Sequence, residues 1–178
     1  RIANIINMQN SVNTIFYIED TVRIFNANDM GYNSSPILYN PPVDAANVGQ
    51  RFVHNPNAFD PDGDSLVFSL IPPKQGQSAN VSGYLYPNQI QAALNNQFKI
   101  NPKTGELIWE YPQVQGIYNI AILVQEYRAG FLIGTVVRDM QIFVESTSNR
   151  PPVLTIPENI CVVAGDSVNF SIIATDAD

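Results

Sequence analysis

The chain has 178 residues, of which 45% are hydrophobic and 14% charged, and its formal net charge is −7. The hydrophobic share suits a globular core and argues against wholesale disorder. The negative balance argues against a nucleic-acid partner, because phosphate binding needs a basic face. No apolar run approaches the roughly 18 to 20 residues of a membrane-spanning helix, so we expect no membrane insertion.

The first segment of the chain reads as β-structure. Residues 11–18 and 21–25 are rich in β-branched and aromatic side chains and are bounded by Asn and Asp, which is typical of strands. Residues 23–25 resemble residues 141–143, and a polar linker follows both. We therefore expect residues 1–32 to be the C-terminal hairpin of a preceding domain.

An internal repeat is the strongest organisational signal in the sequence. Residues 33–38 align with residues 149–154, an offset of 116 positions (149 minus 33), and the register continues without a gap. The further matches along it are Pro41 with Pro157, Gly49 with Gly165, Ala58 with Ala174, Asp60 with Asp176, and Asp62 with Asp178. The sequence therefore predicts tandem repeats, with a complete domain at residues 33–148 and the first strands of a truncated next repeat at residues 149–178.

Within residues 33–148 almost every segment is predicted to form a strand or a turn. Strands are expected at 67–71, 98–100, 106–109, 116–124 and 131–137, and a long polar loop at 74–96 with one short helical turn at 89–94. Trp109 and Leu107 should face the core, and residues 101–105 should form a hairpin turn closed by Gly105. Tyr118 is either a tyrosine corner or an ordinary cross-strand tyrosine. An all-β fold with an antiparallel two-sheet sandwich is the natural outcome.

The motif that indicates chemistry is Asp60-Pro61-Asp62-Gly63-Asp64. Carboxylates at alternate positions can turn several oxygens toward one hard cation, and calcium accepts six to eight oxygens in flexible geometry. An EF-hand is excluded, because the positions that need glycine and a bidentate glutamate hold Ser65 and Ile71. We expect instead a loop between two strands at the end of a sandwich.

That loop should lie beside the loop around Glu126 and the linker around Asn28, Asp29 and Asn33, which together would form a calcium cage at a domain junction. The 116-residue offset predicts a second junction near Glu145 and Asn149. The predicted metal ligands are Asp29, Asp60, Asp62, Asp64, Glu126, Asp176 and Asp178.

Two alternatives to calcium stay open. The first is that the motif is a turn without metal, because Asp side chains cap the backbone and Gly63 supplies a positive φ. The second is that Arg128 supplies the counter-charge in place of an ion.

Three stretches together resemble the cadherin-like and Ig-like repeats of bacterial surface proteins: residues 60–66, 101–107 and 116–118. The longer run from 33 to 142 is similar to large secreted proteins of gliding bacteria, which carry a gliding-motility-associated C-terminal sorting domain. In that family a PKD-like domain often precedes such a repeat, and residues 1–32 resemble its final hairpin. The Leu-Asp-Arg-Glu glutamate of animal cadherins has no counterpart here, which counts against a full multi-calcium junction.

The resemblance implies an Ig-like or cadherin-like Greek-key sandwich in tandem repeats, exported to the bacterial cell surface or secreted. It also implies a role in cell adhesion or as a structural spacer. The partners would be neighbouring repeats of the same chain and a surface glycan or protein.

The sequence gives little support for an enzymatic function. His54 is the only histidine, and a structural or surface role is expected for it. The nucleophile elbow, the zinc-protease helix motif and the phosphate-binding glycine loop are all missing from the sequence. We therefore expect a non-catalytic module. The alternative is a carbohydrate-binding accessory module of a secreted enzyme, in which Asn80, Tyr84 and Tyr86 contact a sugar instead of only anchoring their loop.

Overall fold

The computed structural model describes residues 4–26, 30–157 and 159–178. The chain divides into two compact units, Arg1–Ser146 and Thr147–Asp178. In the described residues the regular elements are β-strands and two short 3₁₀ turns. No helix among these residues is long and apolar enough to cross a bilayer.

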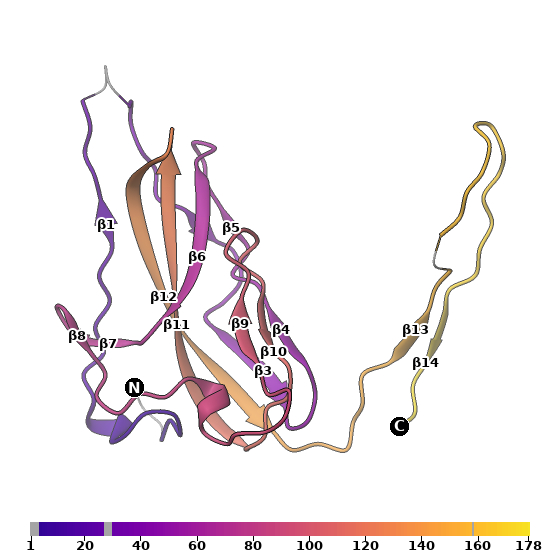
Figure 1. Ribbon diagram of the computed structural model, residues 1–178, viewed down its shortest axis with the longest axis horizontal. Helices are drawn as coiled ribbons and strands as arrows, with labels where there is room; N and C mark the ends of the chain where they lie inside the picture. Colours follow the sequence, from indigo (N-terminus) through magenta and orange to yellow (C-terminus); the bar gives the residue numbers. More distant parts are fainter. Residues whose placement is uncertain (1–3, 27–29, 158) are drawn as a thin grey trace. The chain divides into compact units, whose positions relative to one another are not determined.

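The first unit is built on one large sheet with the strand order β1-β12-β11-β6, in which β3 also pairs with β12 (Figure 1). Its strands are β1 (Thr21–Val22), β3 (Val43–Asn47), β6 (Ser65–Ile71), β11 (Gly116–Arg128) and β12 (Phe131–Glu145). All pairs are antiparallel except β3 with β12, which is parallel.

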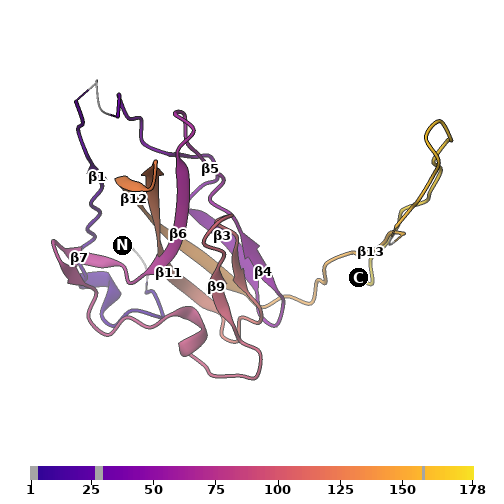
Figure 2. The same cartoon turned by 45° about the horizontal axis from the view of Figure 1, so that its top comes forward.

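A second, smaller layer packs against this sheet. It contains the three-stranded sheet β4-β10-β9 and the pair β2-β5, and Figure 2 shows it as a layer of its own beside β11 and β12. The strands are β2 (Ile37–Leu38), β4 (Phe52–His54), β5 (Ala58–Phe59), β9 (Phe98–Ile100) and β10 (Leu107–Trp109). Two layers of β-strands make the unit an Ig-like or cadherin-like β-sandwich, as the sequence predicted.

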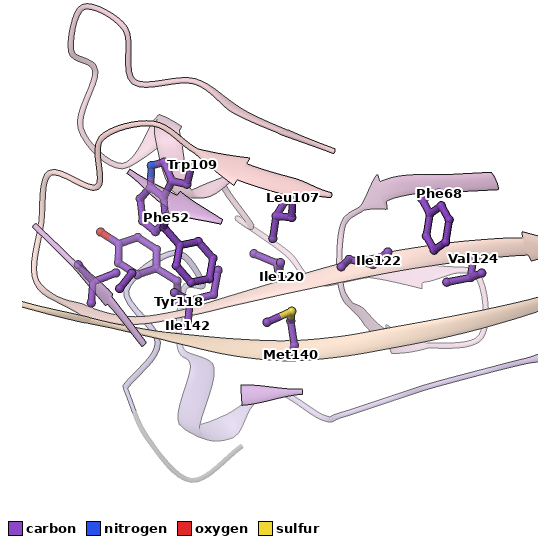
Figure 3. Packing of buried hydrophobic residues seen from close by; sticks show 12 residues of the cluster. Phe52, Phe68, Leu107, Trp109, Tyr118, Ile120, Ile122, Val124, Met140 and Ile142 are labelled. Carbon is purple, nitrogen blue, oxygen red and sulfur yellow. The ribbon is translucent and has the colours of Figure 1, made fainter. Parts of the chain in front are cut away.

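The core lies between the two layers (Figure 3). Its buried members are Ala46, Phe52, Phe68, Leu107, Trp109, Tyr118, Ile120, Ile122, Val124, Met140, Ile142 and Val144. Alternate residues of a strand point to the same face, which is why every second residue of β11 from Tyr118 to Val124 enters this cluster. The predicted core positions of Trp109 and Leu107 are confirmed.

Two local predictions are also confirmed. The turn between β9 and β10 is closed by the Gly105 amide, which donates to the Asn101 carbonyl at 2.9 Å while Gly105 holds a positive φ of 72°. The Tyr118 hydroxyl donates to the Val114 carbonyl at 2.8 Å, four residues upstream. That bond is the mark of a tyrosine corner.

The segment between β6 and β9 is more structured than a long polar loop. It contains the short hairpin β7 (Lys74–Gly76) and β8 (Ala79–Asn80), and then a 3₁₀ turn, η2 (Pro87–Gln89). The expected helical turn therefore lies slightly earlier, where Pro87 presets the first helical position. Tyr84 packs on the buried cluster around Val81, and the Tyr86 hydroxyl lies 3.5 Å from the Leu70 carbonyl. Both tyrosines anchor this segment.

Residues 4–26 differ from the expected hairpin, because they join the first unit. Residues 11–13 form a 3₁₀ turn, η1 (Ser11–Asn13), and Thr21 and Val22 pair with Thr135 and Gly134 of β12. Period-2 patterning identifies a strand but not its partner, which explains the difference.

The start of this segment lies along β11, where β6 does not reach. Ile5 forms a parallel bridge with Ile117, and the Ile6 amide donates to the Ile117 carbonyl at 2.9 Å. The buried Asn7 side chain donates to the Asn119 carbonyl at 2.8 Å and accepts from the Asn119 amide at 2.9 Å. Residues 5–7 thus satisfy backbone groups on a strand edge that would otherwise stay open.

The second unit is a hairpin-like segment. Its paired strands are β13 (Val153–Thr155) and β14 (Ile173–Thr175). Its described residues are exposed, including the free cysteine Cys161.

Candidate metal centre

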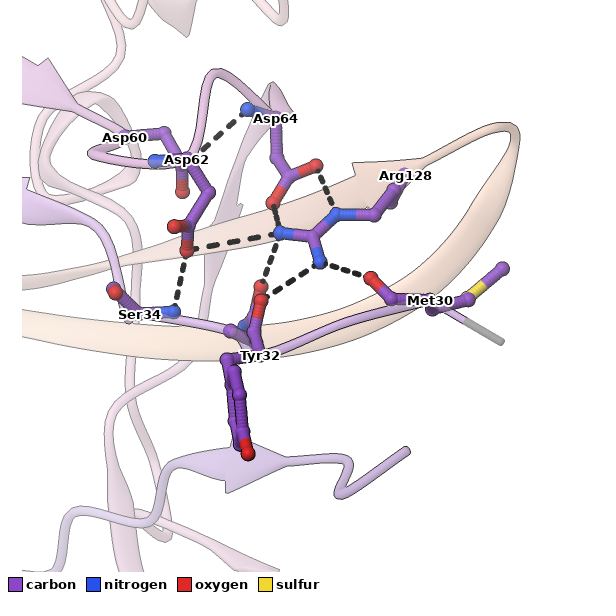
Figure 4. A network of polar contacts seen from close by, with 8 residues as sticks. Met30, Tyr32, Ser34, Asp60, Asp62, Asp64 and Arg128 are labelled. Atoms are coloured by element: carbon purple, nitrogen blue, oxygen red, sulfur yellow. Dashed lines mark hydrogen bonds and ion pairs between the residues drawn. The ribbon is translucent and has the colours of Figure 1, made fainter. Parts of the chain in front are cut away.

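The candidate site forms where β6 begins and β11 ends. Ser65 and Leu66 at the start of β6 pair with Tyr127 and Glu126 of β11, so the loop 60–64 lies against the end of β11. The linker before β2 passes the same place, and Figure 4 shows its residues Met30, Tyr32 and Ser34 beside the loop. Three separate segments of the chain therefore supply polar groups to one region.

Glu126 continues the inward face of β11. It follows Val124 by two residues and is 1% exposed, although it carries a carboxylate. A bulge in the β11–β12 ladder occurs between Glu126 and Tyr127, and Glu126 lies opposite Gly134. A Cβ atom at position 134 would collide with Glu126 Oε2, so glycine there makes room for the carboxylate. Among the described residues, Glu126 Oε1 has no hydrogen-bond partner.

Asp60 organises the loop from within. It is 6% exposed, and its Oδ1 accepts hydrogen bonds from the amides of Asp62 at 2.9 Å and Asp64 at 3.0 Å. Gly63 has a φ of 80°, which lets the chain turn around this oxygen. The second oxygen, Asp60 Oδ2, is buried and without a hydrogen-bond partner in the part of the chain that the structure describes.

Arg128 ties the loop to the linker (Figure 4). Its guanidinium pairs with both oxygens of Asp64, with a 2.8 Å bond from Nε to Oδ1. It also donates to the carbonyls of Met30 at 2.7 Å and Tyr32 at 2.9 Å, and to Asn33 Oδ1 at 3.0 Å. The hydrogen bonds from Arg128 lower the pKa of Asp64 below its usual value, against the effect of burial.

Asp62 has a different role from its neighbours. One of its oxygens accepts the Ser34 amide at 2.6 Å and lies 3.6 Å from the Arg128 guanidinium. It therefore fastens the linker instead of pointing at the other carboxylates. Asp62 and Arg128 together hold residues 30–34 against the loop from two sides.

The remaining carboxylates form a cluster with excess negative charge. One oxygen each from Asp60, Asp64 and Glu126 lies within 4.8 Å of the others. Burial first, and then the charges of Asp60 and Asp64, together raise the pKa of Glu126 to about 7, while the nearby Asn33 amide acts in the opposite direction. Three carboxylates against one guanidinium leave the cluster short of positive charge when all are ionised.

The geometry fits a hard cation. Calcium–oxygen distances are about 2.3–2.6 Å, so two oxygens bound to one ion can lie up to about 5 Å apart. The 4.8 Å limit of the cluster is within that span. Asp60 Oδ2 and Glu126 Oε1 offer unpartnered lone pairs, whereas the oxygens of Asp64 already accept from Arg128. Waters and Asn33 would have to complete the coordination.

The seven predicted ligands thus have different positions. Asp60, Asp64 and Glu126 lie together, and Asp62 binds the linker. Asp29, like Asn28, lies outside the described residues. Asp176 and Asp178 belong to the second unit, where both are exposed.

Arg128 was suggested as a counter-charge, and in the structure it forms an ion pair with Asp64. Gly134 was not predicted to contribute. A glycine inside a strand-forming run was the signal that could have indicated it.

His54 ends β4 in the second layer, whereas the cluster lies on β11 and on the loop between β5 and β6. It is 5% exposed, its Nδ1 is 2.8 Å from Asp44 Oδ2, and its ring stacks on Phe52. These contacts are those of a structural histidine that positions β4.

No family model and no curated protein matches this chain. A provisionally assigned alpha-galactosidase from Bacteroides fragilis is similar over 64% of this chain and 18% of its own, at 10% identity and a TM-score of 0.38. The human desmocollin-1 ectodomain is similar over 74% of this chain and 22% of its own, at 17% identity and a TM-score of 0.36. The chain spans about a fifth of the length of each, and likenesses this distant carry no conclusion about function.

Proposed function

We propose that the first unit is a non-catalytic structural and adhesive β-sandwich module of a secreted or cell-surface bacterial protein, stiffened at its N-terminal junction by a calcium ion. The observation that supports the ion is the pair of buried carboxylate oxygens, on Asp60 and Glu126, that have no partner among the described residues. Buried charge without a partner is costly, and a bound divalent cation removes that cost.

Stiffening follows from where the cluster lies. The linker at residues 30–34 is held to the loop 60–64 by Arg128 and Asp62, and the loop is held to β11 through the same cluster. An ion bound by Asp60, Asp64 and Glu126 would neutralise the repulsion between the loop and the strand. The linker, the loop and the sheet would then move as one piece, which suits a spacer that transmits force or holds its neighbours at a fixed angle.

Calcium suits an extracellular setting. Extracellular modules bind calcium with dissociation constants on the order of 10⁻⁴–10⁻³ M, and an arginine in the ligand shell favours the weak end of that range. Secretion, surface location and attachment to further repeats belong to the same proposal. They are supported by the sequence resemblance.

The test is thermal unfolding with chelator and with about 10 mM calcium. For a dissociation constant on the order of 1 mM, the ion adds about 1.4 kcal/mol to the free energy of unfolding, a rise in Tm of about 4 °C. Glu126→Gln should abolish the rise, since it removes a charged ligand and keeps the shape. The matched control is Glu110→Gln, a carboxylate near the surface that pairs with Arg51 at 3.3 Å.

Two results would contradict the calcium proposal. One is a wild-type Tm that does not respond to calcium, and the other is a calcium response of equal size in Glu126→Gln. The first result would mean that calcium does not stabilise the module, and the second that calcium binds away from Glu126.

A carbohydrate-binding module is the second candidate, because the first unit also carries a groove of about 600 Å³ lined mainly by amides and hydroxyls. Its lining residues are Gln9, Asn10, Asn13, Thr14, Ile15, Gln75, Ala79 and Ser82. Neutral amides suit sugar hydroxyls, which both donate and accept hydrogen bonds. Binding on a glycan array that Asn13→Ala and Gln75→Ala both abolish would favour this candidate, and a blank array excludes it for the glycans tested.

A further inference from the structure

The second unit repeats the register of the first at the offset seen in the sequence. In the first unit Ile37 pairs with Phe59 and Leu38 with Ala58. In the second unit Val153 pairs with Thr175 and Leu154 with Ala174. Each of these four positions is shifted by 116, so β13 and β14 correspond to β2 and β5 residue by residue.

The carboxylate contact to the linker is repeated as well. In the first unit the Ser34 amide donates to Asp62 Oδ2, and the Asp62 amide donates to Asp60 Oδ1. In the second unit the Arg150 amide donates to Asp178 Oδ2, and the Asp178 amide donates to Asp176 Oδ1. The same four atoms of the motif make the same bonds, again at a shift of 116. A shared register and a shared set of polar contacts are two independent signs of one fold.

The apolar residues of the second unit occupy positions that are buried in the first. Ala46, Phe52 and His54 are 5%, 6% and 5% exposed, and their counterparts Val162, Val168 and Phe170 are 52%, 45% and 58% exposed. Pro56 is buried, and its counterpart Ile172 is 60% exposed. The second unit therefore presents the inner face of a sandwich layer without the sheet that covers it. Such contiguous apolar exposure marks an interaction surface.

We propose that residues 149–178 are the first strands of a second domain of the same fold, and that their exposed apolar face docks a set of strands equivalent to β6 and β9–β12. The first unit shows which contacts the docking makes. There β4 pairs with β10, and β3 pairs with β12 in parallel. By the offset, residues 168–170 pair with a strand like β10, and residues 159–163 run parallel to a strand like β12. This inference does not depend on whether the first unit binds calcium.

The test is a chimera in which the second unit is given the later strands of the first unit. Residues 63–148 are appended after Asp178, and hydrogen exchange is followed in peptides that cover residues 159–170. In the present chain the described residues of this stretch carry no strand pairing, so their amides should exchange rapidly. In the chimera their exchange should slow by at least about tenfold. The control chimera carries Val168→Asp and Phe170→Asp, and it should lose the slowing while the first unit keeps its own protection.

A reciprocal graft guards against a packing mismatch in the chimera. Residues 33–62 of the first unit are replaced by residues 149–178, and folding is read from the emission of Trp109, which is buried at 1% exposure in the native unit. A blue-shifted emission and a cooperative melt support the proposal. Slowed exchange in the chimera or a folded graft sustains it, whereas unchanged exchange together with an unfolded graft overturns it.

Discussion

At the scale of single residues, two carboxylates of the cluster at the β6–β11 junction have opposite environments. Asp64 lies under the Arg128 guanidinium, which holds its pKa below the usual value. Glu126 faces the core side of the sheet, and burial raises its pKa to about 7. Arg128 thus lowers the pKa of one acid while burial raises the pKa of the other, and the chain keeps a proton-binding group close to neutral pH.

This difference predicts how stability changes with pH in the absence of calcium. The folded-state pKa of Glu126 is about 7 against an ordinary 4.5, so the folded protein binds more protons than the unfolded chain between these values. Stability therefore falls as the pH rises through this window and is level above it, with a total loss of at most about 3 kcal/mol. The lowered pKa of Asp64 acts only at more acidic pH. Urea unfolding in chelator at about pH 5 and pH 8 measures the loss.

Glu126→Gln should remove most of that loss, since the amide does not titrate. Glu110→Gln changes a carboxylate outside the cluster and should leave the slope as it is. An unchanged slope in Glu126→Gln would assign the pH dependence to another group.

At the scale of elements, the long β11–β12 pair positions the cluster. Alternation along β11 places Glu126 in line with Val124, and the bulge beside it directs the end of the strand toward the linker. Much of this element was predictable, because the run of alternating apolar residues from Tyr118 identifies the strand and its inward face. The bulge and the space behind Glu126 were not predictable, since they depend on which residue of β12 lies opposite. Gly134 occupies that position because any side chain would meet the carboxylate.

Gly134→Ala should therefore be costly although alanine suits β-strands no worse than glycine does. The new methyl group forces Glu126 out of its place, and we expect a loss of about 1–3 kcal/mol in the free energy of unfolding. Gly76→Ala is the matched control, because a Cβ there meets Ala79 Cβ at an ordinary 3.7 Å. The control should stay within about 0.5 kcal/mol of the wild type. Equal unfolding midpoints for both variants would show that Glu126 can move away without cost.

At the scale of the whole molecule, sequence and structure agree on the all-β class and on the carboxylate loop, and they differ on how residues 4–26 are used. The predicted strands at 11–18 and 21–25 were assigned to each other, whereas the structure attaches Thr21 and Val22 to β12 and residues 5–7 to β11. Sequence patterns describe one segment at a time, and the choice of partner depends on which sheet edges remain open. The meeting of Asp60, Glu126 and Arg128 was inferred from loop order in a sandwich, which is why it was predictable, while the contacts of Asn7 were not.

Asn7 connects the N-terminal segment to β11 and to the segment before η2. Its amide bonds to the backbone of Asn119, 112 positions away, and to the Leu85 carbonyl at 2.9 Å. Asn7→Ala leaves the buried amide and carbonyl of Asn119 without these partners, which should cost about 1–3 kcal/mol per unsatisfied group.

Because the sandwich core does not include residues 4–14, we expect the Asn7→Ala loss to be local at first. Hydrogen exchange should speed up in residues 4–14 and at the neighbouring end of β11, while the β6–β11 pairing keeps its protection. Asn13→Ala removes an exposed amide that donates to Asn10 Oδ1, and it should change neither region. If exchange accelerated uniformly across β6, β11 and β12 in Asn7→Ala, residues 4–14 would instead be an integral part of the cooperative core.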